Sequence, residues 1–280
     1  MAELSYTFLR LLPKNTLSRA VGAACRMSAP RPVLRAVIRA FCTKYGVDVT
    51  EAERAVEEYP TFTEFFTRRL KPGARPIAPG ELLPVSPVDG TLGELGEIVE
   101  SKLYQAKGKH YTLAELIGGP NAEEDARQFA GGAFCTIYLA PYNYHRIHAP
   151  LGGQITGYVI MPGQLWPVNP VGLRNVEKLF AVNERLTTFL ETPRGPCAVV
   201  AVGATNVGRI RAVYDDVVTN VKRTRQPVRK IYPQPIPVEK GGELAIFEMG
   251  STVVVLFAPG VKLSERLAPG QPIKLGEPLE

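Results

Sequence analysis

The chain has 280 residues, 45% of them hydrophobic, which is enough to bury a core in one large domain or in one domain with a smaller appendage. No apolar run approaches the roughly 18–20 residues that cross a bilayer, and no signal-peptide pattern opens the chain, so we expect a protein without a membrane span that stays on the cytoplasmic side. The net charge is +6, and residues 1–40 account for all of it, because they contain seven basic residues and one acid.

The first 75 residues have the pattern of helices. Apolar residues are spaced as on one helix face at 17–25 and again at 34–45, where Pro32 suits the first helical turn and Gly46 the end. Two capping patterns predict a third and a fourth helix start, and they are Thr50 with Glu53 and Thr61 with Glu64.

Residues 1–45 allow two interpretations. In the first, they form a helical cap whose apolar side chains pack on the core while the arginines face water. In the second, they form a basic amphipathic surface that lies on anionic lipid. The arginines would then sit at the level of the headgroups, and the side chains that dip inward would be Phe8, Leu9, Leu11 and Leu12.

From about residue 76 the pattern changes to short apolar runs separated by Gly, Pro and Asn. The runs read as strands at 134–139, 155–160, 198–202, 213–218 and 251–257. We therefore predict an α+β fold, in which N-terminal amphipathic helices precede a β-rich core of the sandwich or barrel type. Residues 1–75 would form the basic helical docking and cap segment, and residues 76–280 the catalytic domain.

Few side chains can perform acid–base catalysis near neutral pH, because the chain has only three histidines. His110 lies in a polar stretch that reads as a surface loop. His145 and His148 form an H-x-x-H pair after a strand-like run, and in a turn both rings would face one cavity. No cysteine or acid stands at metal-ligand spacing beside them, so no metal site is predicted. The four cysteines are scattered and are expected to be reduced, mostly buried thiols.

One acid and one serine complete the reactive groups. Asp89 lies in a turn bounded by proline and glycine, where the ordinary role of an Asp is to bond its own backbone. Ser251 follows Gly250 at the start of a β-branched run, which taken alone is a plain strand start. Asp89, His148 and Ser251 would make a hydrolytic triad in that order. The serine lacks the G-x-S-x-G elbow of α/β hydrolases and precedes a strand.

Seven segments, in order, resemble the phosphatidylserine decarboxylase family, and the resemblance covers residues 60–260. They are Phe65–Pro76, Ser86–Gly90, Tyr144–His148, Val168–Pro170, Asn183–Arg185, Val202–Thr205 and Met249–Thr252. The chain departs from the family pattern in two places. Met249 stands where the family often has leucine, an apolar exchange of similar volume. Asn143 stands where the family often has an acid, so a role for that acid is in doubt here, whereas Asp89 remains.

The resemblance implies that the chain cuts itself. Asp89 would orient His148, and His148 would take the proton from Ser251, whose Oγ would attack the carbonyl carbon of Gly250 to give an ester. β-Elimination and hydrolysis would then release ammonia and leave a pyruvoyl group in place of Ser251. Gly250 suits this step because it has no Cβ and tolerates a strained backbone. The products would be a large chain, 1–250, and a small chain, 251–280.

The resemblance also implies what the pyruvoyl cofactor does. Its ketone would form a Schiff base with the serine amine of phosphatidylserine and accept the electrons as CO2 leaves, giving phosphatidylethanolamine. His145 would be the proton donor, with His148 as the alternative. The headgroup would be bound by cationic or hydroxyl side chains. The candidates are Arg68, Arg69, Arg75 and Tyr144.

The implied partners are an anionic membrane surface, phosphatidylserine and a second copy of the chain, with no nucleic acid. In this context the lipid interpretation of residues 1–45 is favoured, and the protein would be peripheral on the cytoplasmic face of the cell membrane. Two alternatives remain open. One is a serine hydrolase that uses Asp89, His148 and Ser251 without cutting itself, and the other is a non-catalytic peripheral membrane protein.

Overall fold

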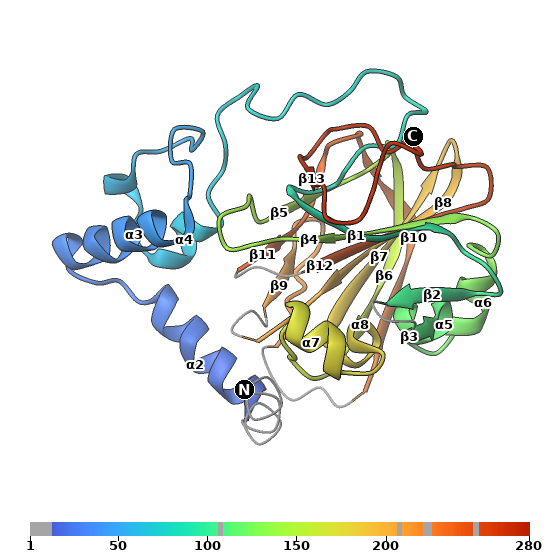
Figure 1. The fold of residues 1–280 in the computed structure, drawn as a ribbon, viewed down its shortest axis with the longest axis horizontal. Helices are drawn as coiled ribbons and strands as arrows, with labels where there is room; N and C mark the ends of the chain where they lie inside the picture. Colours follow the sequence, from blue (N-terminus) through green and yellow to red (C-terminus); the bar gives the residue numbers. More distant parts are fainter. Residues whose placement is uncertain (1–12, 106–108, 206–208, 221–225, 249–251) are drawn as a thin grey trace.

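The computed structural model describes residues 13–105, 109–205, 209–220, 226–248 and 252–280. Two β-sheets pack face to face, and a group of N-terminal helices stands at one side of them (Figure 1). The α+β class is therefore confirmed, with a large antiparallel sheet at its centre. Among the described residues, no helix is both long and apolar enough to cross a membrane.

The large sheet has eight strands, and the strand nearest the predicted cleavage site lies near its middle. In spatial order the strands are β10 (Val228–Val238), β6 (Gly153–Met161), β7 (Arg185–Thr192), β8 (Gly195–Val202), β12 (Thr252–Phe257), β4 (Ala133–Tyr138), β1 (Gly90–Glu97) and β13 (Pro272–Ile273). All neighbouring strands are antiparallel.

The smaller sheet has three strands, and its central strand leads towards the predicted cleavage site. Its order is β5 (Arg146–His148), β11 (Glu243–Phe247) and β9 (Ile210–Ala212). A separate hairpin is formed by β2 (Lys102–Gln105) and β3 (Lys109–Thr112). The chain therefore passes from the small sheet to the middle of the large sheet between β11 and β12.

Side-chain alternation along β12 explains why the large sheet is covered on both faces. Val253 and Val255 pack in the core shared with the small sheet, whereas Val254 and Leu256 pack in a second core. Short helices cover this second face, and they are α5 (Leu113–Ile117), α6 (Ala122–Arg127), α7 (Pro170–Asn175) and α8 (Leu179–Val182). A strand buried on both faces reads as a continuous apolar run, which is the pattern seen in the sequence.

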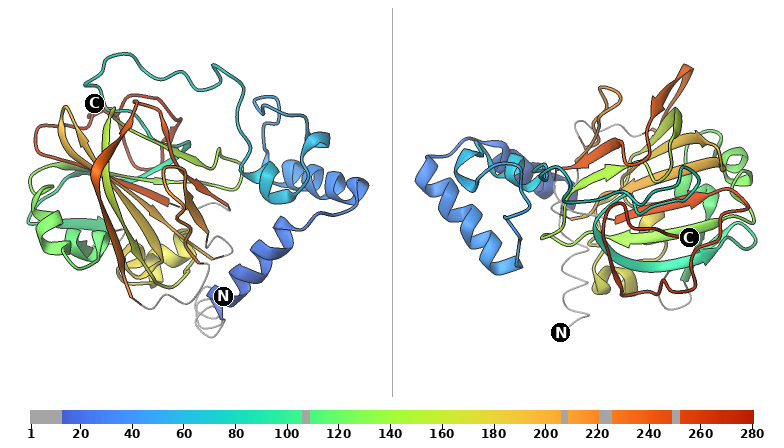
Figure 2. Two further views of the ribbon diagram at one scale, coloured as in Figure 1. Left: turned by 180° about the vertical axis from the view of Figure 1, so that it is seen from behind. Right: turned by 90° about the horizontal axis from the view of Figure 1, so that it is seen from above.

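The N-terminal segment contains α2 (Lys14–Arg26), α3 (Arg31–Tyr45), the 3-10 helix η1 (Val56–Glu58) and α4 (Phe62–Phe66). Figure 2 shows α3 extending away from the sheets. Leu34 and Ile38 of α3 pack with Phe65 in a core of their own. Gly46 ends α3 in the left-handed conformation, with φ of 70°, as predicted.

Predicted and observed elements differ in several places. The fourth helix start is confirmed, because Thr61 accepts a hydrogen bond from the Glu64 amide at the beginning of α4. The third is wrong, because Thr50 bonds Asp48 and Ala52 forms a β-bridge with Leu70.

The predicted strand at 213–218 is also wrong. This segment is a turn in which Asp215 bonds the amide of Asp216, and the strand ends earlier, at Ala212. The predicted strands at 134–139, 155–160 and 198–202 correspond to β4, β6 and β8. The inward-dipping residues 8–12 lie outside the described residues. All four cysteines are free, two of them fully buried and two partly.

Candidate active site

Asp89 lies in the turn that precedes β1. The Ser86 hydroxyl donates to the Val88 carbonyl at 2.7 Å and closes this turn. Gly90 follows Asp89 at a point where any side chain would collide, since an added Cβ would lie 2.5 Å from the Tyr138 carbonyl oxygen. Asp89 is buried, and its Oδ1 accepts the Leu275 amide at 2.9 Å. The acid is therefore held on the core side by the backbone of the C-terminal segment.

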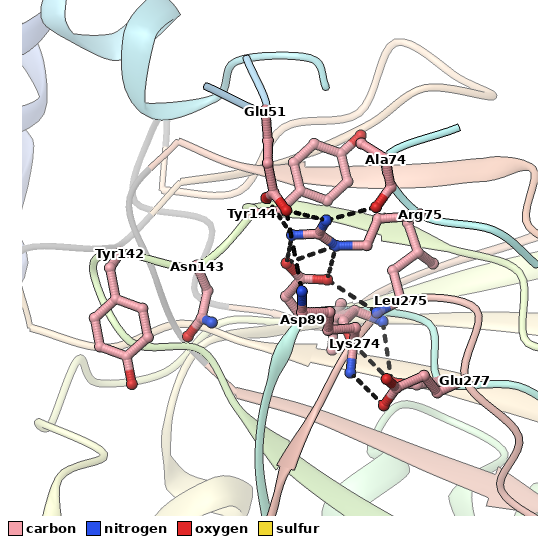
Figure 3. Close-up of polar contacts among 12 residues, drawn as sticks. Glu51, Ala74, Arg75, Asp89, Tyr142, Asn143, Tyr144, Lys274, Leu275 and Glu277 are labelled. Atoms are coloured by element: carbon pink, nitrogen blue, oxygen red, sulfur yellow. Dashed lines mark hydrogen bonds and ion pairs between the residues drawn. The ribbon is translucent and has the colours of Figure 1, made fainter. Parts of the chain in front are cut away.

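Arg75 supplies the charge opposite Asp89. Its Nε donates to Oδ1 at 2.8 Å and its Nη2 to Oδ2 at 2.6 Å, so the ion pair has two parallel bonds. Figure 3 shows the guanidinium between two carboxylates, those of Asp89 and Glu51. The other N–H groups of Arg75 are used by Glu51 and by the Ala74 carbonyl. The expectation that Arg75 binds a substrate headgroup does not fit this geometry, because every guanidinium donor is already taken.

His148 is the third strand residue of β5, and its hydrogen bonds define its tautomer. Its Nδ1 lies 2.8 Å from the Gly241 carbonyl, which only accepts, so Nδ1 carries the proton. Nε2 is then the unprotonated nitrogen, and it accepts from the Tyr144 hydroxyl at 3.3 Å. Burial lowers the pKa of His148, so the neutral ring is favoured near pH 7. His148 thus has one unprotonated, basic nitrogen, which already accepts a hydrogen bond from the Tyr144 hydroxyl.

The structure brings Asp89 and His148 into one cluster through their backbones. The His148 amide donates to the Pro87 carbonyl at 2.9 Å, two residues before Asp89. In the described part of the chain, no hydrogen bond joins the Asp89 carboxylate to the His148 ring, since Arg75 and Leu275 occupy the carboxylate. The negative charge of Asp89 still acts on the ring, where it opposes the lowering of the His148 pKa.

His145 has a different environment from His148. It precedes β5 and is completely buried, with its ring stacked on Phe66 at a centroid distance of 4.0 Å. Neither ring nitrogen has a hydrogen bond of normal geometry to a described residue, but the Asn143 backbone lies close enough to oppose the lowering of the ring's pKa. Burial, followed by the positive charge of Arg68, lowers the pKa of His145 to about 3, so the ring is neutral. His148 is the last residue of β5, and His145 immediately precedes this strand.

The two remaining arginines differ sharply in exposure. Arg68 is 4% exposed, and its only hydrogen bond from the guanidinium to a described residue goes to the Tyr142 carbonyl at 3.3 Å. Burial lowers the pKa of Arg68. Arg69 is largely exposed and lies 3.8 Å from a Glu243 carboxylate oxygen. Of the predicted headgroup contacts, Arg69 alone is freely accessible, and Tyr144 is buried with its hydroxyl on His148.

Gly250 and Ser251 lie outside the described residues, but the chain on either side of them is well defined. The Phe247 amide donates to the His145 carbonyl at 2.9 Å, and the Glu248 amide donates to the Arg209 carbonyl at 3.0 Å. Thr252 begins β12 and pairs with Tyr138 on β4 and with Val202 on β8. The described chain therefore ends beside the His145 backbone before the predicted cleavage site and resumes at Thr252 in the middle of the large sheet.

Two cavities open beside this region. The first, of about 260 Å³, is mostly apolar and is lined by Thr252, Tyr138, Val168 and Phe180 among others. The second, of about 270 Å³, has a larger polar share than the first and is lined by the charged side chains of Asp89, Arg68 and Lys274 and by Tyr144 among others. Thr91 of β1 borders both cavities. An apolar chain and a polar headgroup would thus find different surroundings within a short distance.

Some site residues were not foreseen from the sequence. Gly241, whose carbonyl orients His148, carried no signal beyond a Gly-Gly pair typical of a turn. Glu51 was read as part of a capping box. Glu184 lies in a family-like segment, is buried, and accepts the Asn220 amide at 2.7 Å. Burial raises the pKa of Glu184 to about 7. In the described part of the chain, no group of three or more His, Cys, Asp or Glu side chains is placed to hold a metal ion.

Comparison with known proteins agrees with the sequence resemblance. The sequence model of the family described as phosphatidylserine decarboxylase matches residues 62–279. A relative from Anaeromyxobacter sp. (strain K), named phosphatidylserine decarboxylase proenzyme, is 57% identical over 99% of this chain and 98% of its own length. Relatives of the same name from Myxococcus xanthus and Brevibacillus brevis are 54% and 46% identical, and each match covers at least 90% of both chains.

Proposed function

Since this chain belongs to the phosphatidylserine decarboxylase family, we propose that it cuts itself between Gly250 and Ser251 and then converts phosphatidylserine to phosphatidylethanolamine. The observation that carries the proposal is the cluster of Asp89 and the neutral His148. His148 lies in β5, which pairs with β11, and β11 leads to the proposed cleavage site. The word proenzyme in the names of the relatives fits a precursor that is processed.

His148 is proposed as the base of the self-cleavage. Its Nε2 lone pair would take the Ser251 hydroxyl proton after the Tyr144 hydroxyl gives up its place. The Gly241 carbonyl holds the ring in the required tautomer, and the nearby charge of Asp89 would stabilise the imidazolium that forms. The Ser251 oxygen would then attack the Gly250 carbonyl carbon, exchanging an amide bond for an ester.

The residues beside the cleavage site fit a pyruvoyl group at position 251. This group would supply an electrophilic ketone for the substrate amine and an acceptor for the electrons released with CO2. Thr252, the residue after position 251, lines the apolar cavity. This cavity has room for the part of the lipid next to the headgroup. His145 is held near the end of β11, because its ring packs on Phe66 and its backbone carbonyl accepts a hydrogen bond from the Phe247 amide.

His145 is proposed as the proton donor of the decarboxylation. Because its pKa is about 3, it would donate from a neutral ring N–H, whose competing acceptor is the nearby Asn143 backbone. Arg69 is proposed as a contact for the headgroup phosphate, since its guanidinium is exposed. Tyr144 would act through His148 and not on the headgroup.

The helices α2 and α3 are proposed to dock on the cytoplasmic face of the membrane. They carry exposed apolar side chains next to basic ones. Figure 2 shows α3 extending away from the sheets, whereas α2 contacts the core near its two ends, through Asn15 to the Gly163 carbonyl and through Arg26 to Glu248. The exposed apolar side chains are Leu17 on α2, Met27 directly after it, and Val33, Val37 and Tyr45 on α3. An anionic bilayer would attract the arginines, at about 1 kcal/mol for each basic residue near the surface.

Binding should therefore be strong to vesicles containing phosphatidylserine, weak to phosphatidylcholine vesicles, and reduced by salt. Equal binding to both would contradict docking by charge.

Decarboxylation of phosphatidylserine vesicles tests the activity itself. The purified protein should release CO2 and lose activity after treatment with phenylhydrazine, which blocks ketones. Ser251→Ala should be inactive. A serine hydrolase that uses Asp89, His148 and Ser251 would instead be insensitive to phenylhydrazine and blocked by a fluorophosphonate. The family resemblance also leads us to propose a homodimer, which sedimentation equilibrium would test.

A further inference from the structure

The ion-pair cluster of Glu51, Arg75 and Asp89 joins two parts of the chain that the sequence suggested were separate. Glu51 belongs to the N-terminal segment, and its carboxylate accepts from Arg75 Nη1 at 2.9 Å and from Nη2 at 2.7 Å. Asp89 belongs to the β-rich core and accepts from Nε and Nη2 of the same guanidinium. Arg75 therefore bridges the N-terminal segment and the acid of the proposed cleavage site (Figure 3).

The geometry leaves Arg75 no free donor. A guanidinium has five N–H bonds, and all of them find an acceptor here, four on the two carboxylates and one on the Ala74 carbonyl. The side chain of Arg75 is only 9% exposed and that of Asp89 only 6%. Burial alone would lower the pKa of Arg75, but the hydrogen bonds to Asp89 and Glu51 outweigh it and raise the pKa. The fork of an arginine fits this double task, whereas the single charge of a lysine does not.

The backbone holds each member of the cluster in place. The Lys71 amide donates to the Glu51 carbonyl at 2.8 Å, and Ala52 bridges Leu70, so the backbone at Glu51 is paired with the segment that leads to Arg75. On the other side, the Leu275 amide fixes the Asp89 oxygen that also receives Arg75 Nε. Asp89 is thus oriented by three N–H donors, one from the Leu275 backbone and two from Arg75.

From this geometry we infer that Arg75 is a positioning residue for the self-cleavage, which holds Asp89 in the orientation that supports His148 and ties it to Glu51. The inference rests on the proposed function, because it concerns the rate of the same cleavage. It assigns no contact with substrate to Arg75. Without the guanidinium, Asp89 would be a buried carboxylate with one backbone donor, and it would turn towards water or another cation.

The test measures the rate at which freshly translated chain is converted to two fragments. Arg75→Ala should be processed roughly 10²-fold more slowly than the unchanged chain, the size of effect that a misplacement of about 1 Å produces. Arg75→Lys should also be slow, because an ammonium cannot bridge both carboxylates. Guanidinium chloride at low millimolar concentration should restore much of the rate to Arg75→Ala and nothing to Arg75→Lys. The matched control is Arg229→Ala, since Arg229 forms a similar pair with Asp125 at the far edge of the large sheet.

A double variant separates positioning from simple loss of structure. In an Asp89→Asn background, the Arg75→Ala change should slow processing no further, because the carboxylate it orients is gone. If Arg75→Ala fails to fold, Arg75→Lys decides the question. Processing of Arg75→Lys at the normal rate would overturn the inference and leave the proposed function intact. If the unchanged chain itself never cleaves, the proposed function fails, and this outcome is distinct from the first.

Discussion

The substitution His145→Leu should separate the stability of the fold from its activity. His145 is fully buried, and its ring has only a backbone contact with Asn143, so one ring nitrogen lacks a partner among the described residues, which costs about 1–3 kcal/mol. Leucine has a similar volume and no polar atoms. It would lose the stacking on Phe66, which is worth about 0.5–1.5 kcal/mol. The balance favours leucine by about 1 kcal/mol, or about 2–4 °C in Tm for a protein of this size.

The stability measurement should be made in a Ser251→Ala background, so that both proteins remain uncut. Thermal unfolding of the double variant is expected at a higher temperature than that of Ser251→Ala alone. His110→Leu is the matched control, because His110 lies exposed on β3 and its replacement should change stability by less than about 0.5 kcal/mol. A fall of several degrees for His145→Leu would mean that the ring has a partner that stabilises it, and the reasoning would be wrong.

The activity measurement uses the chain with Ser251 intact. His145→Leu should still cut itself, since His148 is the proposed base, but should decarboxylate roughly 10²–10⁴-fold more slowly, the usual contribution of a general acid. Normal turnover by the processed variant would refute the role of His145 as proton donor. Failure to cut would show instead that His145 takes part in the first reaction.

Three further predictions concern His148, Glu184 and α3. Burial lowers the pKa of His148, so the rate of self-cleavage should be constant above the ordinary imidazole range near 6.5 and should fall only at lower pH; a rate that falls already between pH 8 and 7 would contradict this. Because the pKa of Glu184 is raised to about 7 in the folded state, the unfolded chain releases this proton first, and up to about 3 kcal/mol of stability should be lost as pH rises from about 4.5 to 7. Glu184→Gln keeps the acceptor for Asn220 and should abolish this slope in urea unfolding of Ser251→Ala at pH 5 and pH 8, whereas an unchanged slope would exclude Glu184 as its source. Replacing both Val33 and Val37 with glutamate should weaken sedimentation with anionic vesicles roughly 10²-fold, at about 1–2 kcal/mol for each valine, while Ile231→Glu on the exposed edge strand should not; equal effects would refute docking through α3.

The parts of the fold that were predicted correctly rest on local signals. Short apolar runs identified β4, β6 and β8. The strands β4 and β8 are buried on both faces and read as continuous apolar runs, whereas β6 is only partly buried. The helix predicted at residue 50 failed because tertiary contacts outweighed a capping pattern. Glu51 is used by Arg75, and the backbone nearby pairs with residues 69–71. A sequence pattern cannot reveal such a competing partner 24 residues away.

The sequence predicted the residues of the site more fully than the contacts between them. Asp89 and His148 were named from motifs, and the structure brings them into one cluster through the bond from His148 to Pro87. The contacts of the His148 ring depend on Gly241 and Tyr144, and the carbonyl of Gly241 is a backbone group that carries no residue-type signal. Arg75 was expected at the headgroup because cations bind phosphate. Its burial between two carboxylates is a property of the packed chain alone.

The mass of the purified protein tests the central claim most directly. The account predicts two chains from one precursor, a large chain ending at Gly250 and a small chain beginning at position 251. The small chain should be lighter than a serine-initiated peptide by one ammonia, and its blocked end should resist Edman degradation. Ser251→Ala should give a single uncut chain of full mass. A preparation that decarboxylates phosphatidylserine while remaining one uncut chain would contradict the account.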